Sequence, residues 1–437
     1  MKVTEAKKWL LAEAGRRGVD LEVLATSQSK LTIQARDGAT SDVGMATSGG
    51  IGLRVIKDGR VGYAYSEELT EEALGWTLDE AIGNADLQEQ GSAALPAGTA
   101  LGRHELVDEG LSAALQEKKA ATIQLERQLS ADPRVQTMQN AGYTERRSEV
   151  EIGSTRGADG AYHVGHASLF GALVMREGES VKQGYEQDAK REFHQLDPGR
   201  TAQETLRKLG RHLGAKPLKT GRRRAIFEPD VVSTLLALFT YAVSGKTLAE
   251  KRSRLDGKLG TKVASELVTI VDDATLPDGL GSRPFDSEGT AARRLVIVED
   301  GVLRSFIHNS DTAARTQQAN TGHAARSYRG TLDVGTSNLL LLPGSGVTYG
   351  SGLLVTDLMG VHAGANPITG DVSVQGMGLE LVGGEQVPVD DFAISFNLFN
   401  LLERVEEVGD DAEWIAGWTG VAKVPSLAVD DVSFAGA

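Results

Sequence analysis

Tight-turn dipeptides recur between short β-like runs in the first half of the chain, and this pattern constrains the fold more than any other feature. Asp37-Gly38, Asp58-Gly59 and Asp159-Gly160 lie beside such runs, and Glu177-Gly178 gives a similar signal. Asp-Gly accepts the positive φ angles that tight hairpins require, so each dipeptide predicts two strands joined as an antiparallel hairpin. The first half is therefore predicted to contain short antiparallel strands at 21–26, 30–35, 52–56, 60–65, 135–139, 149–153, 167–176 and 180–186.

Segments with helical periodicity lie before and after each of two groups of predicted strands, 21–65 and 135–186. Residues 2–17 and 111–131 carry apolar side chains at helical spacing before the strands. One helix begins near Thr70, a good N-cap, and another covers 201–213 after the second group. The order helix, antiparallel strands, helix thus occurs twice before residue 215. This order suggests a duplicated α+β unit.

A change of composition at residues 215–224, with the sequence AKPLKTGRRR, predicts the main domain boundary. Residues 1–220 are expected to form an α+β domain with an antiparallel sheet and flanking helices. Residues 221–437 are expected to form a β-rich mixed domain that opens with a helix at Pro229. At about 150 residues per domain, a chain of 437 residues is long enough for two or three domains. The predicted fold class is α+β.

The balance of charges limits the partners of the chain. It has 46 Lys and Arg against 60 Asp and Glu, a formal charge of −14. Nucleic-acid binding needs concentrated positive charge, so no direct nucleic-acid partner is expected, and the basic residues of 215–224 are interpreted as a solvated linker. The sequence contains no run of 18 apolar residues, so no membrane span is expected. The absence of cysteine excludes disulfides, thiolate zinc ligands and a cysteine nucleophile, and it fits a reducing cytoplasm.

Two neighbouring carboxylates are the main candidates for chemistry. Asp286 and Glu288, in the segment SRPFDSEG, are two positions apart, and in an extended chain they would point to the same side. Such a pair can bind a cation or a substrate amine, or act as an acid and a base. From the spacing alone, a structural role is somewhat better supported than a chemical one: a polar loop held in place by Phe285, with Arg283 nearby for an ion pair.

Six short motifs follow one another across the second half of the chain. They are GKLG (257–260), SRPFDSEGT (282–290), EDGVLRSFIHN (299–309), NTGHA (320–324), NPITGD (366–371) and GLELVGGE (378–385). In this order they resemble the TldD/PmbA family, and the later stretch ISFNLFNLLERVEEVGDD resembles its PmbA branch, also called TldE. The resemblance is strongest over residues 221–437 and extends over the whole chain.

The resemblance implies a two-domain fold and a cytoplasmic peptidase system for unfolded or small peptides. In that family a TldD-type subunit carries an H-E-x-x-x-H helix and a later cysteine as zinc ligands, and it pairs with a PmbA-type subunit that lacks them. Here Thr240, Tyr241 and Gly245 stand where His, Glu and His would be expected. None of the three readily replaces a neutral imidazole as a zinc ligand. No metal or cofactor is therefore expected in this chain, and zinc is expected in a TldD-like partner.

Three hypotheses follow. The first is a PmbA/TldE-like, non-catalytic subunit that forms a dimer with a TldD-like chain, or with itself, and contacts a peptide through Asp286, Glu288 and His323. The second is a self-contained hydrolase that uses Asp286 and Glu288. The third is a protein-binding modulator, as the family's older name, modulator of DNA gyrase, suggests. At a charge of −14, any such role would depend on protein contacts and not on DNA.

Overall fold

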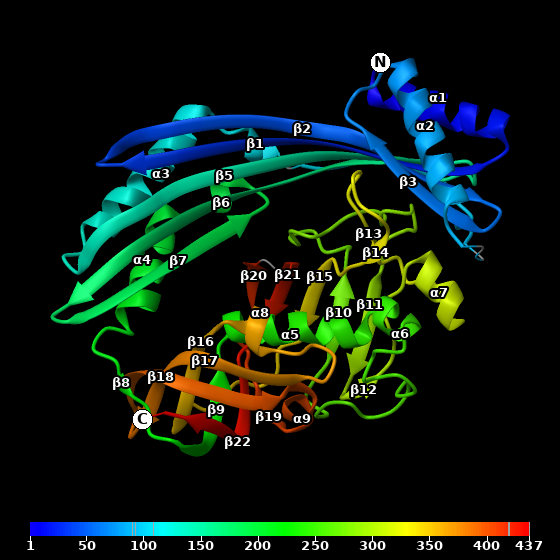
Figure 1. Ribbon diagram of the computed structural model, residues 1–437. Coiled ribbons are helices and arrows are strands. Elements are labelled where there is room, and N and C mark those ends of the chain that lie inside the picture. The colour runs from blue at the N-terminus through cyan, green and yellow to red at the C-terminus, as the bar shows by residue number, and fades with distance from the viewer. Residues whose placement is uncertain (90, 92, 108, 418–419, 437) are drawn as a thin grey trace.

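The computed structural model confirms the predicted α+β class. It describes residues 1–89, 91, 93–107, 109–417 and 420–436. A long curved sheet, formed by residues before 191 and covered by helices from residues before 211, arches over a second body formed by residues from 216 onward (Figure 1). Within the described ranges, no helix has the length and apolar character needed to cross a lipid bilayer.

The arching sheet has seven strands in the order β3-β2-β1-β5-β6-β4, and β7 also pairs with β6. Its neighbours are antiparallel except for β4 and β6. Antiparallel hairpins are therefore the main building unit, as the tight-turn dipeptides predict. The strands are β1 (Asp20–Arg36), β2 (Ala39–Lys57), β3 (Arg60–Ser66), β4 (Ala100–Leu106), β5 (Val135–Ser154), β6 (Asp159–Glu177) and β7 (Ser180–Lys190).

Helices cover this sheet in two pairs, one at each end, and each pair has its own hydrophobic cluster. One cluster lies between the first helix pair and one end of β1 and β2, and the other lies between the second pair, β5 and β6. Short 3₁₀ turns at Glu109–Ser112 and Phe193–Gln195 flank the second pair. The helices are α1 (Val3–Arg17), α2 (Glu71–Asp86), α3 (Leu115–Ser130) and α4 (Pro198–Gly210).

The predicted break between 21–26 and 30–35 is wrong, because β1 runs through both segments. Ser27, Gln28 and Ser29 pair with β2 on one side and with β5 on the other. These polar residues lie between the two hydrophobic clusters, where neither helix pair covers the sheet. A polar stretch inside a long strand therefore looked like the end of a strand. The predicted break between 135–139 and 149–153 is wrong in the same way, because both belong to β5.

The tight-turn predictions hold at two of the three Asp-Gly sites. Asp37-Gly38 has φ angles of 51° and 71°, and Asp58-Gly59 has 50° and 74°, so both form the expected hairpin turns. Asp159-Gly160 instead begins strand β6. A Cβ atom at Gly160 would lie 2.9 Å from the ring of Phe285, so this glycine permits the close approach of the second body to the sheet.

Two larger sheets and one short strand pair form the second body. In one sheet the order is β19-β22-β9-β16-β17-β18-β8, and β22 also pairs with β18, so five of these strands form a closed ring. The other sheet has the order β12-β11-β10-β15-β21-β20. The bounds are β8 (Lys216–Pro217), β9 (Gly221–Phe227), β10 (Ile270–Asp273), β11 (Arg294–Glu299), β12 (Val302–Leu303), β13 (Ala324–Ala325), β14 (Asp333–Val334), β15 (Asn338–Leu341), β16 (Gly352–Met359), β17 (Asp371–Val382), β18 (Glu385–Asn397), β19 (Val405–Val408), β20 (Glu413–Gly417), β21 (Gly420–Val424) and β22 (Leu427–Ala435).

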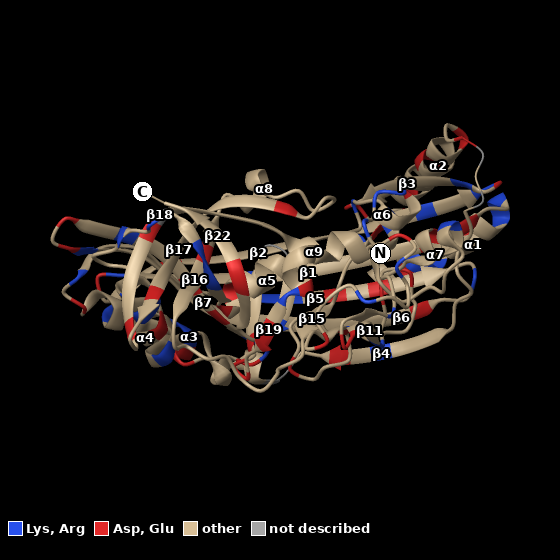
Figure 2. Cartoon of the chain, turned by 90° about the horizontal axis from the view of Figure 1, so that it is seen from below, with Lys and Arg blue, Asp and Glu red and all other residues tan. Residues whose placement is uncertain are grey.

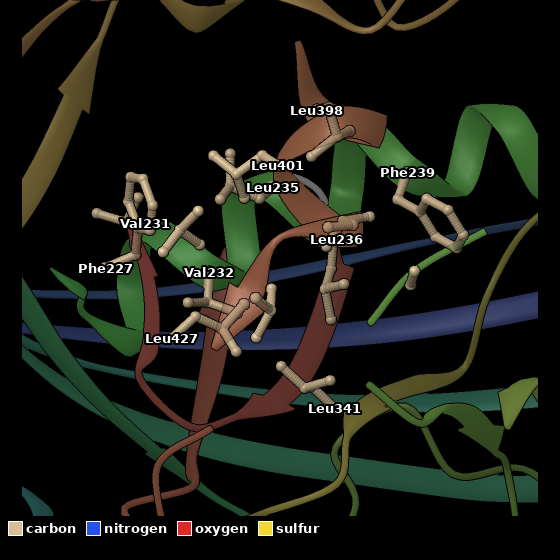
Figure 3. Close-up of a cluster of buried hydrophobic side chains, with 14 of the residues drawn as sticks. Phe227, Val231, Val232, Leu235, Leu236, Phe239, Leu341, Leu398, Leu401 and Leu427 are labelled. Atoms are coloured by element: carbon tan, nitrogen blue, oxygen red, sulfur yellow. The ribbon is translucent and has the colours of Figure 1, made fainter. Parts of the chain in front are cut away.

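Helix α5 (Pro229–Val243) forms the centre of the second body's hydrophobic core. Val232, Leu235 and Leu236 are buried on it and point toward Leu398 and Leu427 from the far end of the chain (Figure 3). The helix begins at Pro229, as predicted, because proline has no N–H to lose in the first turn. The remaining helices are α6 (Gly245–Ala249), α7 (Ser310–Thr316), α8 (Val361–Gly364) and α9 (Leu398–Glu403).

The basic stretch 215–224 is not the solvated linker that its composition predicts. It contributes β8 and the start of β9, and its arginines pair with distant carboxylates. Arg222 pairs with Asp431 at 2.5 Å, Arg223 with Glu380 at 2.6 Å, and Arg224 with Glu407 at 2.8 Å. In Figure 2, basic and acidic segments are interspersed across the face of the molecule. The predicted boundary between residues 220 and 221 remains a prediction.

Candidate functional site

The segment SRPFDSEG, where Asp286 and Glu288 were expected to act together, lies in the second body where it meets the arching sheet. The segment turns at Ser287 and Glu288 and does not run extended. Asp286 is 2% exposed and accepts hydrogen bonds from the backbone N–H groups of Glu288 (3.0 Å), Thr290 (2.8 Å) and Ala324 (2.9 Å). Its carboxylate therefore holds the loop in shape and ties it to the segment that contains His323.

Burial raises the pKa of Asp286 to about 6, and the nearby Glu288 carboxylate adds to the rise. The three N–H groups favour the ionised form, but they do not outweigh burial. The ordinary pKa of an aspartate side chain, which we use for the unfolded chain, is 3.8. The folded state therefore holds this proton more tightly, and its contribution to stability is fully present below the unfolded pKa and lost as the pH rises through the folded pKa.

We expect this titration to appear in a comparison of the protein with Asp286→Asn. The asparagine side chain is neutral at every pH, so the variant cannot titrate at this position. The unfolding free energy of the parent minus that of the variant should therefore fall as the pH rises from about 4 to about 6, because only the parent loses stability through this titration. Urea unfolding of both proteins at several pH values measures this difference. A difference that stays constant or widens would contradict the raised pKa.

Glu288 belongs to a different cluster, which joins the two bodies. It is 2% exposed, pairs with Arg54 of β2, and accepts a hydrogen bond from the backbone N–H of Ser310 at 2.8 Å. Glu22 of β1 lies 3.5 Å from Arg54 and 2.9 Å from Arg326. Two carboxylates and two guanidinium groups thus balance one another in a buried network. Burial is the largest effect on Glu22 and raises its pKa.

His323 has both ring nitrogens engaged. Its Nε2 atom lies 3.0 Å from the Oδ2 atom of Asp272, and its Nδ1 atom lies 2.9 Å from the carbonyl oxygen of Thr321. Asp272 also accepts a hydrogen bond from the Ser337 hydroxyl at 2.6 Å. His323 is 2% exposed. This arrangement supports the loop and leaves no ring nitrogen free for a ligand.

The structure thus brings Asp286 and the segment of His323 together, and it connects Glu288 with the arching sheet. Sequence reasoning missed Glu22, Arg54 and Arg326, because they are far apart in the chain and no local pattern joins them. Asp286, Glu288 and His323 were predicted to contact a peptide. That role remains a prediction, and in this structure all three are occupied by contacts within the chain.

Thr240, Tyr241 and Gly245, here called the zinc-motif positions, do not share one helix. Helix α5 ends at Val243, Ser244 is extended, and α6 begins at Gly245. The Thr240 hydroxyl donates to the carbonyl of Ala237 at 2.6 Å, and 54% of the Tyr241 surface is exposed. Zinc motifs of this type need their ligands on one helical face. The break separates the third position from the first two.

Gly245 is covered by His308. A Cβ atom at Gly245 would lie 2.2 Å from the Nδ1 atom of His308, and the Gly245 N–H donates to the carbonyl of Ile307 at 2.8 Å. The His308 ring is buried, and burial lowers its pKa to about 4. No group of three or more potential metal ligands occurs among the described residues. The zinc-motif positions therefore do not fit a zinc ion in this chain.

A cavity of about 1230 Å³ lies between the arching sheet and the second body. Lys208 of α4 lines this cavity. It pairs with Asp230 at 2.7 Å and with Glu186 of β7 at 3.0 Å. Burial raises the pKa of Glu186 to about 7, although Lys208 opposes the rise. The cavity adjoins the first turn of α5, whereas the zinc-motif positions lie at and beyond its last turn. It is therefore separate from them.

Comparison with known proteins identifies the family. The PmbA/TldA metallopeptidase domain 1 matches residues 21–85, the central domain of that family matches 108–213, and its C-terminal domain matches 220–436. The metalloprotease PmbA homolog of Haemophilus influenzae is 28% identical over 94% of this chain and 91% of its own length. Metalloprotease PmbA of Escherichia coli O157:H7 is 26% identical over 94% and 93%.

Solved structures share the fold. TldE from Thermococcus kodakarensis has a TM-score of 0.88 and 21% identity, and the match covers 98% of this chain and all of that one. A Thermotoga maritima protein described as a candidate modulator of a DNA gyrase has a TM-score of 0.86 and 24% identity, with 99% and 100% covered. The domain matches, which together span most of the sequence, show that the chain belongs to the PmbA/TldD metallopeptidase family.

Proposed function

We propose that the chain is a PmbA/TldE-like, non-catalytic subunit of a two-chain zinc peptidase that degrades or processes peptides. The arrangement at the zinc-motif positions carries the proposal. A hydroxyl bonded to its own helix, an exposed tyrosine and a glycine covered by His308 stand where ligands and a general base would be needed. The chemistry would then belong to a TldD-like partner that supplies the zinc. The cysteine-free sequence supports a cytoplasmic location.

An open strand edge supports a role in holding an extended peptide or a partner chain. Strand β3 pairs with β2 only from Ile51 onward, so the outer edge of residues 39–50 has no pairing strand among the described residues. Unpaired N–H and C=O groups on such an edge can accept another strand. Met45, 83% exposed, lies on this stretch. The edge is long enough to pair with an extended peptide segment.

Reconstitution tests this function. The chain is purified alone, a TldD-like chain with H-E-x-x-x-H is purified alone, and the two are mixed at equal concentration with a fluorogenic peptide. We expect no zinc-dependent cleavage by this chain alone, a stable complex on gel filtration, and faster cleavage by the mixture than by the partner alone. Zinc-dependent cleavage by this chain alone, or no association at all, would refute the proposal.

Of the alternatives, the self-contained hydrolase has the least support from the geometry. Asp286 accepts three backbone hydrogen bonds, and Glu288 is paired with Arg54 and bonded to Ser310. Both carboxylates are 2% exposed, so a substrate would have to displace these contacts. Hydrolysis that persists in the purified chain and disappears in Asp286→Asn, without loss of folding, would favour this alternative.

The non-enzymatic modulator remains the second alternative. The ion pairs of Arg222, Arg223 and Arg224 neutralise the most basic stretch of the chain, which argues against direct DNA contact. A modulator would therefore act through protein contacts. The modulator would be favoured if the chain bound a DNA-handling enzyme equally well with and without a peptidase partner.

A further inference from the structure

The cavity of about 1230 Å³ between the two bodies runs along two strand edges. Six consecutive residues of β7, 185–190, line it, and so do residues 412–417, which include all of β20. Side chains of a strand alternate between its two faces, so a cavity that is lined by every residue of a stretch lies along the edge of that strand. Among the described residues, β7 pairs with β6 alone and β20 with β21 alone. Two open edges therefore face the same cavity.

A single side-chain contact connects these two edges. The Nε2 atom of Gln187 on β7 donates to the carbonyl oxygen of Ala416 on β20 at 2.6 Å. The Ala416 carbonyl thus points toward β7, but it meets an amide side chain there and not the N–H group of a strand. Figure 1 shows β20 and β21 beneath the arch, next to β7. The edges are therefore neighbours that do not pair with each other.

Carboxylates outnumber cations at the end of the cavity where Lys208 lies. Glu186 and Asp230 share this lysine, as described above. Glu413 of β20 and Asp357 of β16 also line the cavity, and neither forms an ion pair within the part of the chain that the structure describes. Burial raises the pKa of both, and the nearby Asp230 carboxylate adds to each rise. One ammonium group thus lies among four carboxylates, and this end of the cavity attracts a further cation.

The arginines of the cavity lie at its other end. Arg146 is near Lys190, because the pairing of β5 with β6 and of β6 with β7 brings the two together. Lys190 is four residues after Glu186 on β7, which is about 13 Å along a strand. Arg200 is eight residues before Lys208 on α4, which is about 12 Å along a helix. The cavity is therefore acidic near Glu186 and basic near Lys190.

We propose that this cavity binds an extended peptide, which pairs with the outer edge of β7 and places a basic side chain at the acidic end. The unpaired N–H and C=O groups of a strand edge accept another strand, and the carboxylates complement a lysine or an arginine. The volume of about 1230 Å³ exceeds the range of about 300–1,000 Å³ that is typical of small-molecule sites, so a peptide segment fits. The site rests on the chain's proposed role in handling peptides, and it adds where this chain holds one and which side chain it selects.

Fluorescence anisotropy with the purified full-length chain and three labelled peptides tests the site. The first peptide alternates Thr and Ala and has one central lysine, the second has glutamate in place of that lysine, and the third is the first with every backbone amide N-methylated. We expect the lysine peptide to bind with a dissociation constant of about 0.1 mM at low salt. The glutamate peptide should bind at least about fivefold more weakly, and the methylated peptide, which cannot donate to a strand edge, at least about tenfold. Equal binding of the lysine peptide and either of the others would overturn the proposal.

Hydrogen exchange identifies the edge that the peptide occupies. At saturation, the lysine peptide should slow the exchange of amides in residues 181–189 at least about fivefold and leave residues 39–50 unchanged. Slowing in 39–50 without slowing in 181–189 would place the peptide on the other open edge and overturn the proposal, as would the absence of slowing in 181–189. These measurements use this chain alone and involve no cleavage. A failure here would therefore leave the result of the reconstitution with a TldD-like chain untouched.

Two variants connect the preference for lysine with the acidic end of the cavity. Glu413→Gln combined with Asp357→Asn should bring the affinities of the lysine and glutamate peptides within about twofold of each other. Neither carboxylate has an ion pair to lose, so the double variant should fold normally, which circular dichroism checks. Glu299→Gln, whose carboxylate pairs with Arg304 on the exposed surface, is the matched control and should keep the preference of the parent. A folded double variant with the parent's preference for lysine would overturn the assignment.

Discussion

Arg54→Met is expected to destabilise the protein by about 3–5 kcal/mol. Arg54 is 1% exposed and lies between Glu22 and Glu288. Its removal leaves two buried carboxylates, of which only Glu22 keeps an arginine partner, Arg326. Removing one member of a buried ion network destabilises the fold by more than the lost attraction, because the remaining charges stay buried without a counter-charge. The free energy of urea unfolding, measured at neutral pH, gives the size of the effect.

A matched control comes from the same strand. Lys57 is three residues from Arg54 and pairs with Asp86 at 2.8 Å, but both side chains are substantially exposed. Lys57→Met should therefore change the unfolding free energy by no more than about 0.5 kcal/mol. If Arg54→Met is as mild as Lys57→Met, the buried network does not join the arching sheet to the second body in the way described above.

Gly245→His is expected to destabilise the protein by about 3 kcal/mol or more, an extreme case of overpacking. A Cβ atom at this position would lie 2.2 Å from the His308 ring, so either the ring or the start of α6 must move. Restoring the complete motif with Thr240→His, Tyr241→Glu and Gly245→His should therefore create neither a zinc site nor activity. Urea unfolding and metal analysis of the purified variants measure both effects.

Two further variants separate the clash from the other changes. Thr240→His with Tyr241→Glu, both near the partly open end of α5, should cost no more than about 1 kcal/mol. Gly245→His combined with His308→Ala should be more stable than Gly245→His alone, because the clash is relieved. A stable triple variant that binds zinc stoichiometrically would show that the motif residues alone, and not the helix break and His308, prevent metal binding.

Local signals in the sequence predicted the helices and hairpins well, because the residues that specify them are neighbours. Thr70 accepts a hydrogen bond from the N–H of Ala73 at 3.2 Å, as an N-cap should. The polar run Ser27–Ser29 misled the strand prediction, since its meaning depends on two separate hydrophobic clusters that helices from elsewhere in the chain create. Strand length in this sheet is set by tertiary packing, which periodicity alone does not reveal.

The candidate site was predictable only as a set of residues and not as an arrangement. The sequence draws attention to Asp286 and Glu288, but their partners Ala324 and Arg54 are distant in the chain. The same holds for the arginines of 215–224, whose carboxylate partners lie more than 150 residues away. His308 could not be recognised as the side chain that covers Gly245, because the contact depends on the strand-like bridge between Ser244 and Ile307.

The division of labour between the two chains is tested most directly by inactivating one chain of the reconstituted pair at a time. In one pair, this chain carries Thr240→Ala and Tyr241→Phe and the partner is unchanged. In the other, this chain is unchanged and the glutamate of the partner's H-E-x-x-x-H is replaced by glutamine. Peptide cleavage by the first pair should stay within about twofold of the parent rate, and cleavage by the second should disappear. Zinc-dependent cleavage that survives in the second pair would contradict a non-catalytic role for this chain.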